Sequence, residues 1–112
     1  MAFEVKIGEL RHPIYFGKII KEKQDGFTSK KEFVSEFASR AKIKHLYGKE
    51  FWEAKSMQKE KTIKFIIRYD SRITYDYEVS FNNTIYEIDD INNIDELNKW
   101  LEIKANVLIG DM

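Results

Sequence analysis

Four groups of side chains in this 112-residue chain have types that support catalysis or metal binding. They are His12, His45, the pair Asp89-Asp90 and the pair Asp95-Glu96. Neither histidine has a carboxylate or a second histidine at the spacing of metal ligands. Paired carboxylates perform acid–base chemistry in enzymes, but the neighbouring asparagines and strand-like residues favour solvated turns here.

The remaining catalytic signatures are missing from the sequence. The chain has no cysteine, which excludes thiol catalysis, thiolate zinc sites and disulfides. It has no glycine-rich phosphate loop and no nucleophile elbow. We therefore predict that the protein is not an enzyme and uses no cofactor and no metal.

A basic stretch between residues 40 and 64 offers phosphate binding instead. Its cationic residues are Arg40, Lys42, Lys44, His45, Lys49, Lys55, Lys59, Lys61 and Lys64. Phe51 and Trp52 lie among them, and OB-like barrels bind nucleic acid by stacking bases on such rings. In the alternative interpretation, the two rings pack on the fold and the lysines form a solvated rim. The pI of about 6.7 lacks the basic bias of a dedicated nucleic-acid binder.

Charge is divided between the two halves of the chain. Residues 1–68 contain 16 Lys or Arg against 9 Asp or Glu, and residues 69–112 contain 3 against 10. One interpretation is that solvated strand faces happen to sort in this way. The other is a bipolar protomer whose basic side meets the acidic side of a second copy, an arrangement that sets register and association rate.

The elements that must position these residues are strands. The strongest signal is residues 62–69, where Ile63, Phe65, Ile67 and Tyr69 alternate with mostly polar residues. Alternation also predicts strands over residues 14–21, 75–81, 84–91 and 100–109. Asn82-Asn83 is typical of a two-residue hairpin turn because asparagine tolerates positive φ.

Three segments have weaker patterns. Residues 22–31 are polar and contain Gly26, so we expect a loop. Residues 32–46 fit a helix face or a strand, and we predict a long, bent strand. Residues 47–60 contain helix formers, and we expect a short helix or a loop excursion across the barrel mouth.

These elements predict a mainly β fold, a small closed or partly open antiparallel barrel of about six strands. Closure is how a small sheet hides its edges. We expect one domain over residues 1–112, with residues 1–12 as an extended lead-in. No stretch reaches the ~20 apolar residues that span a bilayer, and the first residues lack the apolar region of a secretory signal. We therefore expect that the protein is synthesised in the cytosol. We expect no association with a membrane.

Several segments, taken in order, resemble one family. They are residues 7–12 (IGELRH), Phe37-Ala38 with Ile43, residues 48–50 (GKE) with Ala54, residues 62–69 (TIKFIIRY), residues 83–88 (NTIYEI) and residues 101–103 (LEI). Together they resemble the head-tail joining, or head completion, family of tailed bacteriophages and prophages. The resemblance covers about residues 6–109.

The resemblance implies a structural virion protein without catalytic residues, located at the head-tail interface and in the host cytoplasm before assembly. Such a head-tail connector component is a monomer in solution and docks as a homo-oligomeric ring under the portal and adaptor proteins. There it retains the packaged double-stranded DNA and provides an attachment surface for the tail completion protein. On this reading, Lys49, Lys55, Lys59 and Lys61, with Phe51 and Trp52, contact DNA in the ring channel or an adjoining ring. The alternative is a small OB-like nucleic-acid-binding module.

Overall fold

The computed structural model describes residues 6–24, 28–45 and 62–109. These ranges form six strands and two short 3-10 turns. In chain order they are η1 (Ile7–Glu9), β1 (His12–Gln24), β2 (Thr28–His45), β3 (Thr62–Arg68), β4 (Glu78–Phe81), β5 (Thr84–Asn93), η2 (Ile94–Glu96) and β6 (Trp100–Ile109). The predicted mainly β, antiparallel fold of about six strands is confirmed.

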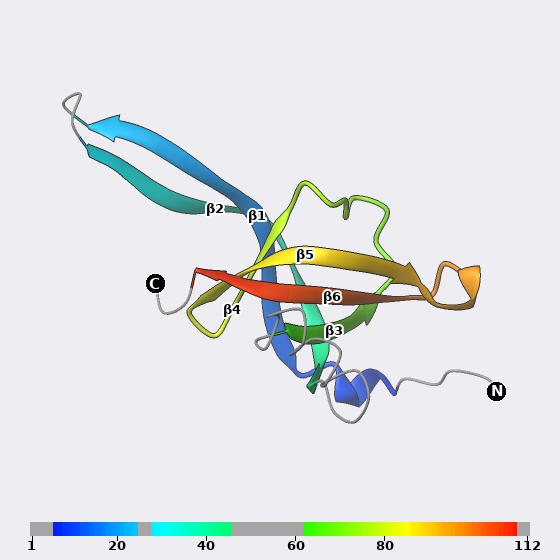
Figure 1. The fold of residues 1–112 in the computed structure, drawn as a ribbon. Coiled ribbons are helices and arrows are strands. Elements are labelled where there is room, and N and C mark those ends of the chain that lie inside the picture. The colour runs from blue at the N-terminus through cyan, green and yellow to red at the C-terminus, as the bar shows by residue number, and fades with distance from the viewer. Residues whose placement is uncertain (1–5, 25–27, 46–61, 110–112) are drawn as a thin grey trace, which may run out of the picture.

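The six strands form one antiparallel sheet whose hydrogen bonds close into a ring, in the order β1-β2-β3-β6-β5-β4. We call this ring the closed sheet (Figure 1). The β1–β4 pairing that closes it runs only from Tyr15 to Gly17 on β1 and from Ser80 to Glu78 on β4. Because of this strand order, β1, β2 and β3 are neighbours on one side of the ring, and β4, β5 and β6 are neighbours on the other.

The interior of the ring is apolar, as the alternating pattern predicts. Phe16, Phe65, Ile67 and Ile103 are fully buried and belong to one cluster with Val79. Other cluster members include Ile14, Ala41, Ile63, Leu101 and Ala105. The Phe65 ring meets the rings of Phe81 and Tyr86 edge-to-face, with centroids 5.7 and 5.5 Å apart, a favoured aromatic geometry. The strand predicted as the strongest therefore lies at the centre of the core.

The hairpin of β1 and β2 extends well beyond the ring (Figure 1). From Lys18 onward β1 pairs only with β2, in a register that runs from Lys18 opposite Val34 to Gln24 opposite Thr28. We call this two-stranded extension, residues 18–24 and 28–34, the arm. At a rise of about 3.3 Å per residue, seven residues make it roughly 20 Å long.

Gly17 stands where the arm leaves the ring. The register shifts between Phe16 and Gly17, so that Glu36 is an extra residue on β2, a β-bulge. A Cβ at Gly17 would collide with the carbonyl oxygen of Val34 and lie 2.8 Å from its carbonyl carbon. Only glycine allows the two backbones to approach this closely.

The segment between β3 and β4 covers one side of the arm's base. The Phe37 ring stacks on Phe16 at 5.2 Å and meets Tyr77 edge-to-face at 5.4 Å. The Arg72 guanidinium lies 4.0 Å from the Phe37 centroid and forms an ion pair with Asp70 at 2.6 Å. This segment thus adds a second layer over an aromatic residue of β2.

Several boundary predictions were wrong. The expected loop at residues 22–31 is strand except for the undescribed residues 25–27, because the arm continues as a ribbon. β4 begins at Glu78, so Tyr75 and Tyr77 precede it. Residues 7–9 of the expected extended lead-in form a 3-10 turn. Residues 47–60, where a helix or excursion was expected, lie outside the described residues.

Two side-chain placements on β3 also differ from the prediction. Tyr69 follows the strand and is 39% exposed rather than buried with Ile63, Phe65 and Ile67. Ile66, expected on the polar face, is 1% exposed. The hairpin prediction is confirmed, since Asn82 and Asn83 have φ of 51° and 61° between β4 and β5, as in a type I′ turn.

Candidate docking surfaces

The closed sheet turns the charge division of the sequence into a division in space. Strands β1, β2 and β3, adjacent in the ring, contain ten Lys or Arg residues against three Asp or Glu. On the opposite side, β4, β5, η2 and β6 contain seven acids against one lysine. We call these the basic side and the acidic side. Separated charge of this size produces a directional field at the surface of a small protein.

The predicted DNA-contacting residues cannot be placed on either side. Lys49, Phe51, Trp52, Lys55, Lys59 and Lys61 all lie outside the described residues. Of the remaining basic stretch, Arg40 and His45 on β2 are exposed. Lys42 pairs with Glu9 at 2.6 Å, and Lys64 pairs with Glu102 at 3.7 Å.

The histidines and paired acids do not converge. His12 packs edge-to-face on Phe81 with centroids 5.7 Å apart, whereas His45 is exposed at the far end of β2. Within the described ranges, no three His, Asp or Glu side chains lie close enough to hold a metal ion. All four acidic side chains are exposed, but Asp89-Asp90 lies within strand β5 and not in the predicted turn, whereas Asp95-Glu96 lies in η2.

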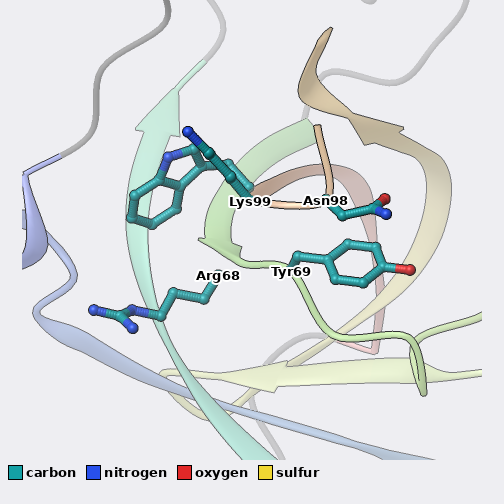
Figure 2. A pocket seen from close by; sticks show the side chains of 5 residues that line it. Arg68, Tyr69, Asn98 and Lys99 are labelled. Atoms are coloured by element: carbon teal, nitrogen blue, oxygen red, sulfur yellow. The ribbon is translucent and has the colours of Figure 1, made fainter. Parts of the chain in front are cut away.

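An open pocket of about 380 Å³ lies where β3 ends and β6 begins. It is lined by Arg68, Tyr69, Asn98, Lys99 and Trp100. Figure 2 shows Arg68 and Lys99 pointing to one side of it, and Tyr69 and Asn98 to the other. The amide of Tyr69 donates to the Lys99 carbonyl at 2.9 Å and fixes the two strand ends together. Two cations and two large rings suit an anionic, planar or apolar partner group.

A second hollow of about 350 Å³ lies at the base of the arm. It is lined by Ile19 and Lys31 of the arm together with Glu78, Leu108 and Ile109. The Glu78 Oε2 atom is buried, with no hydrogen-bond partner among the described residues. Burial raises the pKa of this carboxyl above its ordinary value, although Lys18 opposes the shift.

The acidic side ends in an unusual turn. Asp95, Glu96 and Asn98 have positive φ of 54°, 55° and 55°, which is uncommon for residues other than glycine. Two hydrogen bonds between Asn93 and Asn98, at 2.6 and 3.1 Å, hold the turn. It presents the exposed Asp95 and Glu96 carboxylates beside Leu97, which is 58% exposed.

Comparison with known protein families decides what kind of protein carries these surfaces. The phage head completion protein family matches residues 5–108. The match covers every described strand except the last residue of β6. This chain belongs to the phage head completion protein family. The predicted recognition is confirmed, and so is the structural, mainly β description that follows from it.

Solved structures support the fold of this head completion protein independently. The solution structure of protein SF1141 from Shigella flexneri 2a superposes with a TM-score of 0.62. The alignment covers 92% of this chain and 96% of that one, at 15% sequence identity. None of the curated proteins searched matches the chain.

Family membership supports a structural role in closing the phage head, in association with other head and tail proteins. Within the described part of the chain, no helix is long and apolar enough to cross a membrane. Sequence reasoning found the charge division of this head completion protein but missed the arm, the hollow at Glu78 and the Arg68–Lys99 pocket. The pocket and the hollow are lined by residues from separated segments, so no local spacing reveals them, and the arm shows no apolar alternation over residues 22–31.

Proposed function

We propose that this protein closes the filled phage head as a head-tail connector. It is a monomer in solution, docks as a ring under the portal and adaptor proteins, retains the packaged DNA and provides the surface to which the tail completion protein binds. The family match supports the head-closure role. The observation that favours a ring is the separation of basic and acidic strands onto opposite sides of one closed sheet.

A ring built from one kind of subunit needs two different patches that fit each other. The basic and acidic sides meet this requirement by charge, and a surface that is neutral overall limits long-range repulsion between free copies. We also propose that Lys49, Lys55, Lys59 and Lys61, with Phe51 and Trp52, meet DNA in the ring channel. Lysines at a channel would contact phosphates without reading sequence.

The test uses DNA-filled, tailless heads from a phage lacking this gene. Purified protein is characterised alone by size-exclusion chromatography with light scattering and is then added to the heads. We expect a monomer alone, a defined ring on the heads, and slower release of DNA. Failure of the wild-type protein to join the heads or to slow DNA release would overturn the proposal.

The Arg68–Lys99 pocket keeps a second candidate open, an OB-like nucleic-acid-binding module. Its two cations and two rings provide the phosphate and stacking contacts that single-stranded nucleic acid uses. A free monomer that binds DNA oligonucleotides with an affinity falling steeply with salt, and that ignores filled heads, would establish this function instead.

A further inference from the structure

Among the described residues, the two strand segments of the arm pair only with each other. Beyond Gly17, β1 has β2 as its only strand partner, and the register of the arm pairs these two strands alone. Isolated two-stranded ribbons are marginal in water. Even so, the arm exposes apolar side chains, with Ile20 at 45% and Val34 at 42% exposure. A partner that covers the arm would stabilise it.

The charge of the arm indicates the sign of that partner. Its two strand segments contain five lysines against two glutamates. The register also places Lys21 opposite Lys31, and like charges at directly opposed positions are unfavourable. Lysines on an edge discourage pairing with another basic strand. An acidic surface would offset the repulsion between the lysines of the arm, and its charge would attract the lysine-rich edge.

Such a surface exists on the same molecule. Residues 87–97 of β5 and η2 contain five acids and no Lys or Arg, and we call this stretch the acidic face. All five acids, Glu87, Asp89, Asp90, Asp95 and Glu96, are exposed. Leu97 adds an apolar group that is 58% exposed. The acidic face therefore offers the carboxylates and the apolar contact that match the lysines, Ile20 and Val34 of the arm.

The arm does not reach the η2 end of its own acidic face. Figure 1 shows the arm at one end of the molecule and η2 at the opposite end, with the closed sheet between them. A contact between the two surfaces must therefore join different copies. Such a contact is head-to-tail, and when successive rotations add to a full turn it forms a ring.

We propose that the arm of each copy docks on the acidic face of the next copy. Lysines of the arm, including Lys31, pair with Asp95 and Glu96, while Ile20 and Val34 cover Leu97. The proposal rests on the ring of the proposed function and names its subunit interface. It assigns a role to the arm and to the strained turn at η2, neither of which serves the core.

The decisive test is a charge swap on filled, tailless heads. One variant combines Lys30→Glu with Lys31→Glu, a second combines Asp95→Lys with Glu96→Lys, and a third carries all four changes. Each two-site variant should leave at least about tenfold less protein on the heads after sedimentation, and the four-site variant should recover most of it. Lys6→Glu and Asp76→Lys are the controls, because both residues are exposed and lie outside the basic side, the acidic side, the arm and the acidic face. Circular dichroism verifies that each variant is folded.

Crosslinking tests the same contact without changing charge. Because the chain has no cysteine, Val34→Cys and Leu97→Cys introduce its only thiols. A short bismaleimide should convert this double variant into a ladder of covalent multimers on heads, whereas either single variant should give none.

The outcomes separate the two proposals. Two-site variants that assemble like wild type, a four-site variant that does not recover, or crosslinking without a ladder would overturn the arm interface and leave head closure intact. Wild-type protein that never joins heads would overturn both.

Discussion

The Nζ of Lys42 lies 2.6 Å from Oε2 of Glu9 and donates a hydrogen bond to it. The pair ties the 3-10 turn η1 to β2. It thereby fixes η1 against the basic side. This hydrogen bond is the main reason that the pKa of Glu9 lies below its ordinary value, against a smaller opposing effect of desolvation.

The Glu9–Lys42 pair predicts a pH-dependent contribution to stability. A carboxyl with a lowered pKa stabilises the fold above its ordinary value of 4.5 and loses that contribution as pH falls through the folded-state pKa. Glu9→Gln should therefore unfold at lower urea concentration than wild type at pH 7, and the two unfolding midpoints should converge as pH falls through the folded-state pKa of Glu9. Glu96→Gln is the control, because Glu96 is exposed on η2. A gap between the two midpoints that stays constant as pH falls would contradict the prediction.

Glu78 should behave in the opposite sense. Its pKa is raised chiefly by burial, so the folded state binds the proton more readily than the unfolded state. Stability is then lost as pH rises from the ordinary value of 4.5 through the folded-state pKa. Glu78→Gln should gain stability relative to wild type between pH 4 and pH 7, as measured by urea unfolding. A gap that narrows with rising pH would show that a partner stabilises the charged carboxylate.

Gly17 should resist replacement while Gly8 accepts it. Alanine at position 17 would collide with the Val34 backbone and come within 2.9 Å of the Phe33 ring, and overpacking of this kind costs about 1–3 kcal/mol. A Cβ at Gly8 meets nothing within 4 Å, so Gly8→Ala should change the unfolding free energy by less than about 0.5 kcal/mol. Equal effects of the two substitutions in thermal unfolding would refute the bulge at the base of the arm.

Neighbouring aromatic residues on β1 test the closed sheet. Phe16 is fully buried and Tyr15 is 44% exposed, because adjacent strand residues point to opposite faces. Phe16→Ala should cost about 3–5 kcal/mol of unfolding free energy. Tyr15→Ala should cost far less. A larger cost for Tyr15→Ala in chemical denaturation would mean that β1 faces the other way.

Most of the fold was predictable because the ring has one buried face. β3 and β6 alternate clearly, and Phe65, Ile103 and Ala105 are buried as their spacing predicts. Asn82-Asn83 predicted the hairpin because asparagine tolerates positive φ, and both residues have positive φ in the structure.

The misses have a common physical cause. The arm is a ribbon without a core behind it, so residues 22–31 show no apolar alternation and resemble a loop. Ile66 is buried on the outer face of β3, between Lys42 and Glu102 in the strand register, and polar neighbours in the sequence gave no sign of this. For the candidate surfaces, the charge division was readable from the sequence. That the arm and η2 lie at opposite ends of the molecule depends on the directions in which the β1–β2 hairpin and β5 extend from the ring (Figure 1).

The short β1–β4 pairing bears on how the molecule opens. Three residue pairs close the ring there, the fewest of the six pairings, followed by four each for β2–β3 and β4–β5. Cooperative units with the fewest stabilising contacts open first, so the sheet has a seam beside Phe16 and Val79. Amides along this seam should exchange with solvent before those of β3 do. Opening this seam converts the closed ring into a curved open sheet and keeps every other strand pairing. A subunit can therefore change the curvature of its sheet by breaking only three residue pairs.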